Sequence, residues 1–262
     1  LRSHPREYSM TDSTIWIARH PAKHACRLRL YCFPYAGGGT QVYRGFAQSL
    51  PEEVELCLIQ LSGRERRFSE PAFTSVNETV CELLAPMLAE TDRPWAFFGH
   101  SLGALIAFEL TRALREESAP SPLHLFVSAH RAPHLPDPTP HIHGLPDSGF
   151  IEELKKLNGT PAEVFDHEEL LGVMLPLIRA DITAAETYAY EPRPPLDCPI
   201  TAFGGSDDPL VSAEEVVPWS EHTISDYSYH IFDGDHFFIH TAQDAVVEAL
   251  RTQLSDLLAR LD

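Results

Sequence analysis

The strongest constraint on this chain is the pentapeptide Gly99-His100-Ser101-Leu102-Gly103, which has the pattern G-x-S-x-G. An apolar run at 95–98 precedes it and an apolar-rich stretch at 104–114 follows it, which predicts a strand, a sharp turn and a helix. In such an elbow the glycines allow close backbone approach, and the serine hydroxyl is raised at the carboxyl edge of a sheet. The alternative is a glycine-bounded turn with an ordinary serine. The flanking pattern favours a serine nucleophile.

Strands and helices alternate through the first half of the chain. Apolar side chains alternate with other residues at 28–32, and apolar stretches typical of buried strands occupy 54–59, 95–98 and 123–129. Helix-compatible segments lie between these strands at 42–50, 75–90 and 104–114. Further strands at 200–203 and 227–232 and a last helix near the carboxyl end resume this order. The alternation is typical of α/β proteins with a mostly parallel central sheet and helices on both faces.

The alternation breaks at Arg131, where the sequence APHLPDPTPHIHGLPD carries five prolines. Proline is excluded from the interiors of strands and helices. Two helical patterns follow, at about 150–157 and 161–188, before a second proline cluster. We interpret 131–196 as a helical lid insertion in a single domain that spans residues 1–262. Residues 1–26 have no place in the pattern and are interpreted as a tail or leading segment.

A serine hydroxyl becomes a good nucleophile only when a base takes its proton and a third group orients that base. In folds that carry a serine in such a strand–turn–helix elbow, the acidic residue that orients the base follows the serine in the chain, and the histidine follows the acidic residue. Each lies in a loop after a strand. His236 follows the 227–232 strand and is the expected general base. The acid is Asp207 or Asp208, and we favour Asp208, because a residue before proline is pushed toward an extended conformation.

Attack on a carbonyl creates an oxyanion, which backbone N–H groups must stabilise. One donor is expected from Leu102, the residue after the nucleophile, and the other from the loop after the first strand. That loop reads FPYAGGG, and Ala36 is the residue we select there.

The charge of the chain is acidic and uneven. Residues 1–130 carry 13 Lys and Arg against 14 Asp and Glu, whereas residues 131–262 carry 7 against 24, for a net charge of −18. Nucleic acids and anionic membranes bind basic surfaces, so neither is an expected partner. No apolar run approaches the ~20 residues of a membrane span, and the five cysteines form no C-x-x-C pair. We therefore expect a cytoplasmic protein. We also expect a monomer.

With these residues placed, the sequence resembles the type II thioesterases of polyketide and nonribosomal peptide synthesis, and the related medium-chain thioesterases of fatty-acid synthesis. The matching stretches, in family order, are FPYAGGG, LSGRERRFSEP, FFGHSLGALIAFEL, PLIRADI, GGSDDP and GDHFF. Two departures are Ser62, where proline is usual, and Asp235, where glycine is common. Neither departure touches a predicted catalytic group.

The resemblance implies an α/β-hydrolase fold and hydrolysis of acyl thioesters from the phosphopantetheine arm of acyl or peptidyl carrier proteins, often to clear stalled or mis-primed chains. It implies a triad of Ser101, Asp208 and His236, and an oxyanion hole of Ala36 and Leu102. No cofactor is expected. The alternatives are an esterase or acyltransferase that acts on a non-carrier substrate, and a catalytically idle protein that binds acyl carriers.

Two clusters of side chains outside the triad have competing interpretations. Arg64, Arg66 and Arg67 form the densest basic cluster and are candidate docking residues for an acidic carrier protein. The alternative is a solvated loop in which local carboxylates such as Glu65 and Glu70 pair with them. The second cluster contains the histidines at 134, 141 and 143. We expect no metal there, because zinc needs three or four ligands and no nearby cysteine completes a set.

Overall fold

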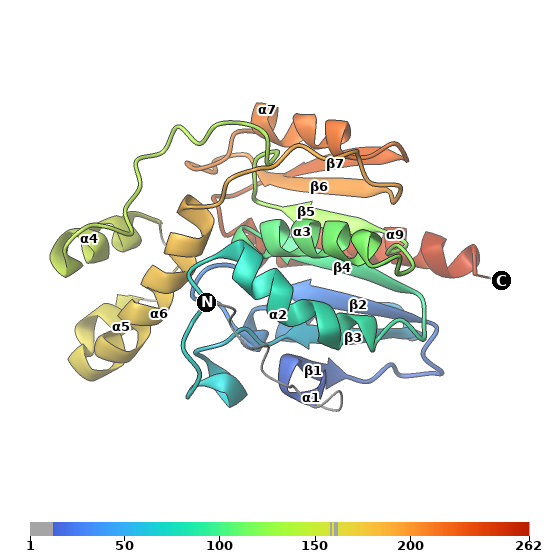
Figure 1. Ribbon diagram of the computed structural model, residues 1–262, viewed down its shortest axis with the longest axis horizontal. Coiled ribbons are helices and arrows are strands. Elements are labelled where there is room, and N and C mark those ends of the chain that lie inside the picture. Colours follow the sequence, from blue (N-terminus) through green and yellow to red (C-terminus); the bar gives the residue numbers. More distant parts are fainter. Residues whose placement is uncertain (1–12, 158, 160–161, 262) are drawn as a thin grey trace, which may run out of the picture.

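The protein folds around one seven-stranded sheet, seen in a computed structural model that describes residues 13–157, 159 and 162–261 (Figure 1). The strand order is β1-β3-β2-β4-β5-β6-β7. The strands are β1 (Ile17–His20), β2 (Leu28–Phe33), β3 (Val54–Ile59), β4 (Trp95–His100), β5 (Leu125–Ser128), β6 (Ile200–Gly205) and β7 (Tyr227–Phe232). Only the pairing of β1 with β3 is antiparallel among these strands. The predicted α/β-hydrolase class is confirmed.

Helices cover both faces of the sheet because successive strand side chains point to opposite faces. On one face lie α2 (Val76–Leu88) and α3 (Leu102–Glu116), and on the other lie η1 (Thr40–Gln48), α8 (Phe238–Thr241) and α9 (Gln243–Ala259). Within β2, Tyr31 and Phe33 join the first apolar cluster and Leu30 and Cys32 join the second. The short elements α7 (Ala213–Val216) and η3 (Val217–His222) lie between β6 and β7 in the chain.

The segment 131–196, which we call the insertion, leaves the sheet after β5. It contains α4 (Asp147–Leu157), α5 (Ala162–Asp166) and α6 (Glu168–Glu186), which Figure 1 shows gathered at one end of the sheet. The pattern at 161–188 is therefore two helices, which separate at His167, where the backbone is extended. The insertion has its own small apolar cluster around Phe150 and Ile178.

The leading segment differs from its prediction. Residues 1–12 lie outside the described part of the chain, but α1 (Ser13–Trp16) and β1 belong to the fold. Ile17 pairs with Ile59 of β3, and both Trp16 and Ile17 are buried. The interpretation of 1–26 as a tail is thus wrong for β1, because a strand of four residues is too short to show a clear alternation.

The loop after β3 contains one further element, η2 (Glu65–Arg67). Among the described residues, no helix combines the length and apolar character that crossing a bilayer requires.

Candidate active site

The G-x-S-x-G pentapeptide forms a strained turn between β4 and α3. Ser101 has φ 53° and ψ −119°, a conformation that non-glycine residues rarely adopt. The flanking glycines are required by close packing: a Cβ on Gly99 would lie 2.1 Å from the carbonyl oxygen of Gly103, and one on Gly103 would lie 2.1 Å from that of Phe33. Only glycine permits these approaches, so the two residues hold the serine at the carboxyl end of β4.

Ser101, His236 and Asp208 lie in hydrogen-bonding contact, although they come from three different loops. Nε2 of His236 lies 3.0 Å from Oγ of Ser101, and Nδ1 of His236 lies 2.8 Å from Oδ2 of Asp208. The side chain of Asp208 has no exposed surface and that of His236 is 6% exposed. This is the geometry of a nucleophile, a base and an acid that orients the base.

The two neighbouring aspartates after β6 have different environments. Asp208 accepts the N–H groups of Leu210 and Val211 at Oδ1, which leaves Oδ2 directed at His236. Asp207 is exposed and contacts the hydroxyl of Ser206. The structure therefore brings Asp208, and not Asp207, to the histidine.

The two expected oxyanion donors belong to residues that line the cavity of the serine. Ala36 and Leu102 line the same cavity as Ser101. Among the hydrogen bonds of the described residues, neither the N–H of Ala36 nor that of Leu102 has an acceptor. N–H groups without an acceptor, at the cavity that holds the nucleophile, are what an oxyanion hole requires.

His100, inside the motif, orients the base, a role that the sequence analysis missed. Its Nε2–H donates to the carbonyl oxygen of His236 at 2.9 Å, so in the neutral ring Nδ1 accepts from the hydroxyl of Ser128, also at 2.9 Å. Burial holds the pKa of His100 well below its usual value, and the nearby ring of His236 adds to this effect. His100 thus stays neutral and fixes the His236 backbone.

A cavity of about 620 Å³ lies over the serine, between the sheet and the insertion. Ser101 and His236 line it from the body, and α6 contributes Ile178 and Ile182. The remaining wall is mixed rather than purely apolar, because Arg131, Glu153, Glu186 and Tyr190 also line it. The cavity is large enough for an acyl group with polar substituents.

The docking prediction is wrong for two of the three arginines. Arg64 is 6% exposed and Arg67 is 3% exposed. Arg64 forms a bidentate ion pair with Asp181, and Arg67 pairs with Glu70 and lies 3.3 Å over the ring of Trp16. Buried guanidinium groups cannot bind a partner protein, and of the three only Arg66 is exposed.

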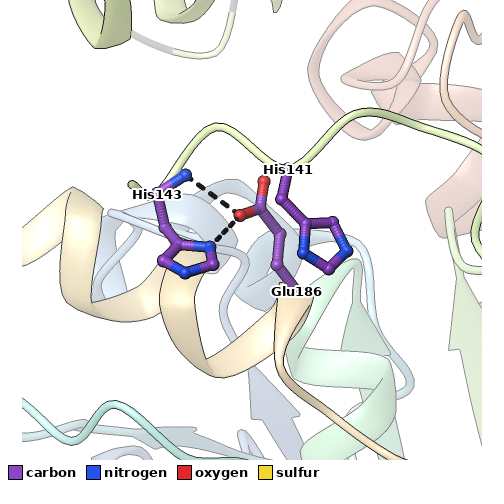
Figure 2. A group of neighbouring side chains, drawn as sticks. All are labelled: His141, His143 and Glu186. Carbon is purple, nitrogen blue, oxygen red and sulfur yellow. Dashed lines mark hydrogen bonds and ion pairs between the residues drawn. The ribbon is translucent and has the colours of Figure 1, made fainter. Parts of the chain in front are cut away.

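The histidines of the insertion form polar contacts within it and with the body. Figure 2 shows His141 and His143 on either side of Glu186, which comes from the end of α6. The carboxylate of Glu186 accepts the N–H groups of Ile142 and His143 at 2.8 and 3.0 Å, and also contacts Nδ1 of His143. These bonds attach the proline-rich segment to α6. His134 instead meets His222, with 2.8 Å between ring nitrogens.

The donor atoms of His141, His143 and Glu186 all lie within 4.8 Å of one another. Imidazole and carboxylate are ligand types that zinc accepts. The carboxylate is, however, already engaged by two backbone N–H groups and a ring nitrogen, which explains the arrangement without an ion. The expectation of no metal stays a prediction.

Comparison with known proteins identifies the family. The thioesterase domain family matches residues 28–254. The solved structure of RedJ, a thioesterase of the prodiginine biosynthetic pathway in Streptomyces coelicolor, superposes with a TM-score of 0.82 and 36% identity over 89% of this chain and 94% of that one. Thioesterase PikA5 of Streptomyces venezuelae is 39% identical over 235 residues, which cover 87% of this chain and 81% of the relative.

A third relative has a name from another reaction class. Linear gramicidin dehydrogenase LgrE of Brevibacillus parabrevis is 41% identical over 246 residues, which cover 93% of this chain and 94% of LgrE. Its name denotes an oxidoreductase, whereas the contact of Ser101 with His236 is that of a hydrolase. The family match and the RedJ superposition agree with the geometry. This chain belongs to the thioesterase domain family, and its relatives include the type II thioesterases of polyketide and nonribosomal peptide pathways.

Proposed function

We propose that this chain hydrolyses acyl thioesters carried on the phosphopantetheine arm of acyl or peptidyl carrier proteins, with Ser101 as the nucleophile. The observation that carries the proposal is the contact of Ser101 with His236, and of His236 with Asp208, at the wall of the 620 Å³ cavity. We further propose that the enzyme clears stalled or mis-primed chains from a polyketide or nonribosomal peptide synthase, as a cytoplasmic monomer.

The first half of the reaction forms an acyl-enzyme. Nε2 of His236 takes the hydroxyl proton as Oγ of Ser101 attacks the carbonyl carbon, and the oxyanion accepts the N–H groups of Ala36 and Leu102. The intermediate then collapses with cleavage of the C–S bond. The pantetheine sulfur leaves with the proton from His236, and the acyl group stays on Ser101 as an ester.

The second half returns the enzyme to its starting state. His236 takes a proton from water, whose oxygen attacks the ester carbonyl and forms a second oxyanion at the same N–H groups. Collapse returns the proton to Oγ of Ser101 and releases the carboxylic acid. Asp208 stabilises the imidazolium of His236 in both halves. Each step balances with water as the only co-reactant, so the proposed cycle requires no cofactor.

Ser101→Ala tests the nucleophile. We expect kcat for hydrolysis of carrier-bound acyl groups to fall about 10⁶-fold, since the remaining site cannot form an acyl-enzyme. Ser225, which is exposed before β7, provides the matched control, and Ser225→Ala is expected to keep parental turnover. A fluorophosphonate probe is expected to label Ser101 alone. Parental turnover by Ser101→Ala would overturn the assignment, and failure to label folded protein would favour an idle binding protein.

The leaving group is tested with three substrates that present one acyl group on a carrier protein, on a short pantetheine mimic and on an oxygen ester. We expect the carrier-bound thioester to be hydrolysed with the highest kcat/KM, because both the thiol leaving group and the carrier surface contribute. A clear preference for the oxygen ester would favour an esterase instead.

Arg66 is the docking residue that we propose, because it is exposed in the nearly neutral half of the chain. Arg66→Glu is expected to lower kcat/KM for the carrier-bound substrate about 2- to 10-fold at low salt and less at high salt, since rim charges act through screened attraction. Turnover of the short mimic should be unchanged. Arg260→Glu, the same charge change at the far end of α9, is the control, and equal losses in both variants would contradict docking at Arg66.

A further inference from the structure

A buried ion pair joins the insertion to the body. Asp181 lies on α6, and Arg64 lies in the loop after β3, 117 residues earlier in the chain. Nη2 of Arg64 donates to Oδ1 of Asp181 at 2.7 Å, and Nη1 donates to Oδ2 at 2.8 Å. The two side chains are only 6% and 5% exposed. Such a pair, withdrawn from water, fixes the relative position of the segments that carry it.

The same two side chains hold the glycine loop that supplies the proposed oxyanion donor. The N–H of Gly37 donates to Oδ2 of Asp181 at 2.7 Å, and Nη1 of Arg64 donates to the carbonyl oxygen of Gly38 at 2.7 Å. Ile178, one turn before Asp181 on α6, packs against the same loop, since a Cβ on Gly37 would lie 2.8 Å from its Cγ1. The loop is therefore held by α6 through a polar and an apolar contact.

We propose that Asp181, supported by Arg64, is a positioning residue that sets the oxyanion N–H of Ala36 according to where α6 lies. The N–H of Gly37 belongs to the peptide plane that follows Ala36, so the carboxylate restricts the backbone rotation of Ala36. The inference rests on the proposed function. According to this inference, α6 both lines the cavity and positions an oxyanion donor. A shift of α6 would therefore alter oxyanion stabilisation.

Stability alone is a poor explanation for the pair. Replacing a buried ion pair by apolar side chains of similar volume is often neutral or stabilising, whereas removing one partner leaves an uncompensated buried charge. An apolar pair could fill this space, but it could not accept the N–H of Gly37. That acceptor, 2.7 Å away, is the feature that requires a carboxylate or an amide on α6.

Two double variants separate these roles. Arg64→Met with Asp181→Leu removes both charges and the acceptor for Gly37, whereas Arg64→Met with Asp181→Asn removes both charges and keeps a side-chain oxygen as the acceptor. Both leave the carbonyl of Gly38 without its arginine, so their difference isolates the bond to Gly37. We expect kcat on the short pantetheine mimic to be about 10- to 100-fold lower in the Leu variant than in the Asn variant, with KM within threefold.

A transition-state readout accompanies the kinetics. A trifluoromethyl ketone adds to Ser101 as a tetrahedral oxyanion, and its inhibition constant should rise in the Leu variant by the factor by which kcat/KM falls. The urea midpoints of the two variants should be similar. Equal kcat values in two folded double variants would overturn the positioning role. Should either fail to fold, Asp181→Glu keeps the charge but displaces the carboxylate. Parental kcat in that variant would overturn the role, and a ~10-fold loss would support it.

These outcomes remain distinct from a failure of the proposed function. If the parent protein itself showed no Ser101-dependent hydrolysis, the function would be wrong, and the double variants would not be needed to show it. If the parent is active and the variants are equal, only the positioning role is wrong.

Discussion

The body of the molecule, residues 13–130 and 197–261, and the insertion bury their side chains in different ways. The body has large apolar clusters on both faces of its sheet, whereas the insertion has a small cluster of Phe150, Leu154, Leu175 and Ile178. Polar contacts join the two regions, among them Asp181 with Arg64, Tyr188 with Glu109, and Arg131 with Glu215. Apolar contacts also join them, since Ala132, Ala184 and Leu196 of the insertion belong to an apolar cluster of the body. The body is thus specified by a repeated apolar pattern, and the position of the insertion by individual polar pairs together with a few apolar contacts.

The largest expected effect compares an apolar cluster of the body with the cluster of the insertion, through a matched pair of substitutions. Phe46 on η1 and Phe150 on α4 are both fully buried. Phe46→Ala is expected to lower the free energy of unfolding by about 3–5 kcal/mol, because it leaves a cavity in the body. Phe150→Ala should cost less than half as much, since a small cluster can open locally without unfolding the sheet. Urea unfolding followed by circular dichroism measures both values.

Hydrogen exchange sharpens this result. In Phe150→Ala the amides of α4 should exchange faster while those of β4 stay protected, which is the signature of local opening. Equal losses of stability from the two substitutions, with faster exchange in β4 as well, would show that the insertion and the body unfold as one unit.

Acidification is expected to destabilise the body, with an effect of intermediate size. Burial lowers the pKa values of His124, His130 and His222 to about 4. These rings stay neutral when folded but take up protons below about pH 6.5 when unfolded, so the unfolded state binds more protons between pH 6.5 and 4. The contribution of these neutral rings to the free energy of unfolding is fully present above pH 6.5 and is lost as the pH decreases toward 4. We expect Tm to fall by several degrees from pH 7.5 to 5.

His124→Gln is the variant that tests this origin. His124 stacks on Phe126, and its Nε2 lies 2.8 Å from the hydroxyl of Thr201. The substitution removes one titrating group, so the dependence of Tm on pH should become shallower, whatever its effect on the absolute Tm. His141→Gln, at an exposed position in the insertion, should leave the slope unchanged. An unchanged slope in His124→Gln would contradict the buried neutral state.

The smallest expected effect concerns metal. Dialysis against a chelator should leave both kcat and Tm within error, because the contacts of Ser101 with His236 and of Glu186 with its backbone donors need no ion. Added zinc should likewise leave Tm unchanged in the parent. A zinc-dependent rise in Tm that His143→Ala abolishes would show that the group in Figure 2 binds metal.

The sequence predicted the parts of the site that depend on local backbone geometry. The glycines around Ser101 predicted the sharp turn that carries the nucleophile, and the order of strands and loops predicted His236 as the base. Asp208 could be preferred over Asp207 because Pro209 restricts its backbone. In each case a short stretch carries the physical cause, so one sequence suffices to place the residue.

Two of the three misses depend on contacts between distant parts of the chain. The burial of Arg64 depends on its ion pair with Asp181, which lies far along the chain, so no local sequence pattern predicts that this arginine is buried. Arg67 pairs with Glu70 only three residues away, and that alternative was visible in the sequence. The role of His100 depends on the backbone of His236, which the fold alone brings near. Burial and partner choice are tertiary properties.

The double engagement of Asp181 bears on how such chains can diverge and be recombined. The carboxylate of Asp181 binds a guanidinium from one segment and accepts a backbone N–H from another. A change of Asp181 or Arg64 alone would therefore leave the charge of the other buried and uncompensated. The two positions should therefore covary among relatives. In a chimera that joins the first half of one thioesterase to the insertion of another, one parent supplies the residue at position 64 and the other the residue at position 181. Such a chimera should be active only when these two residues can pair.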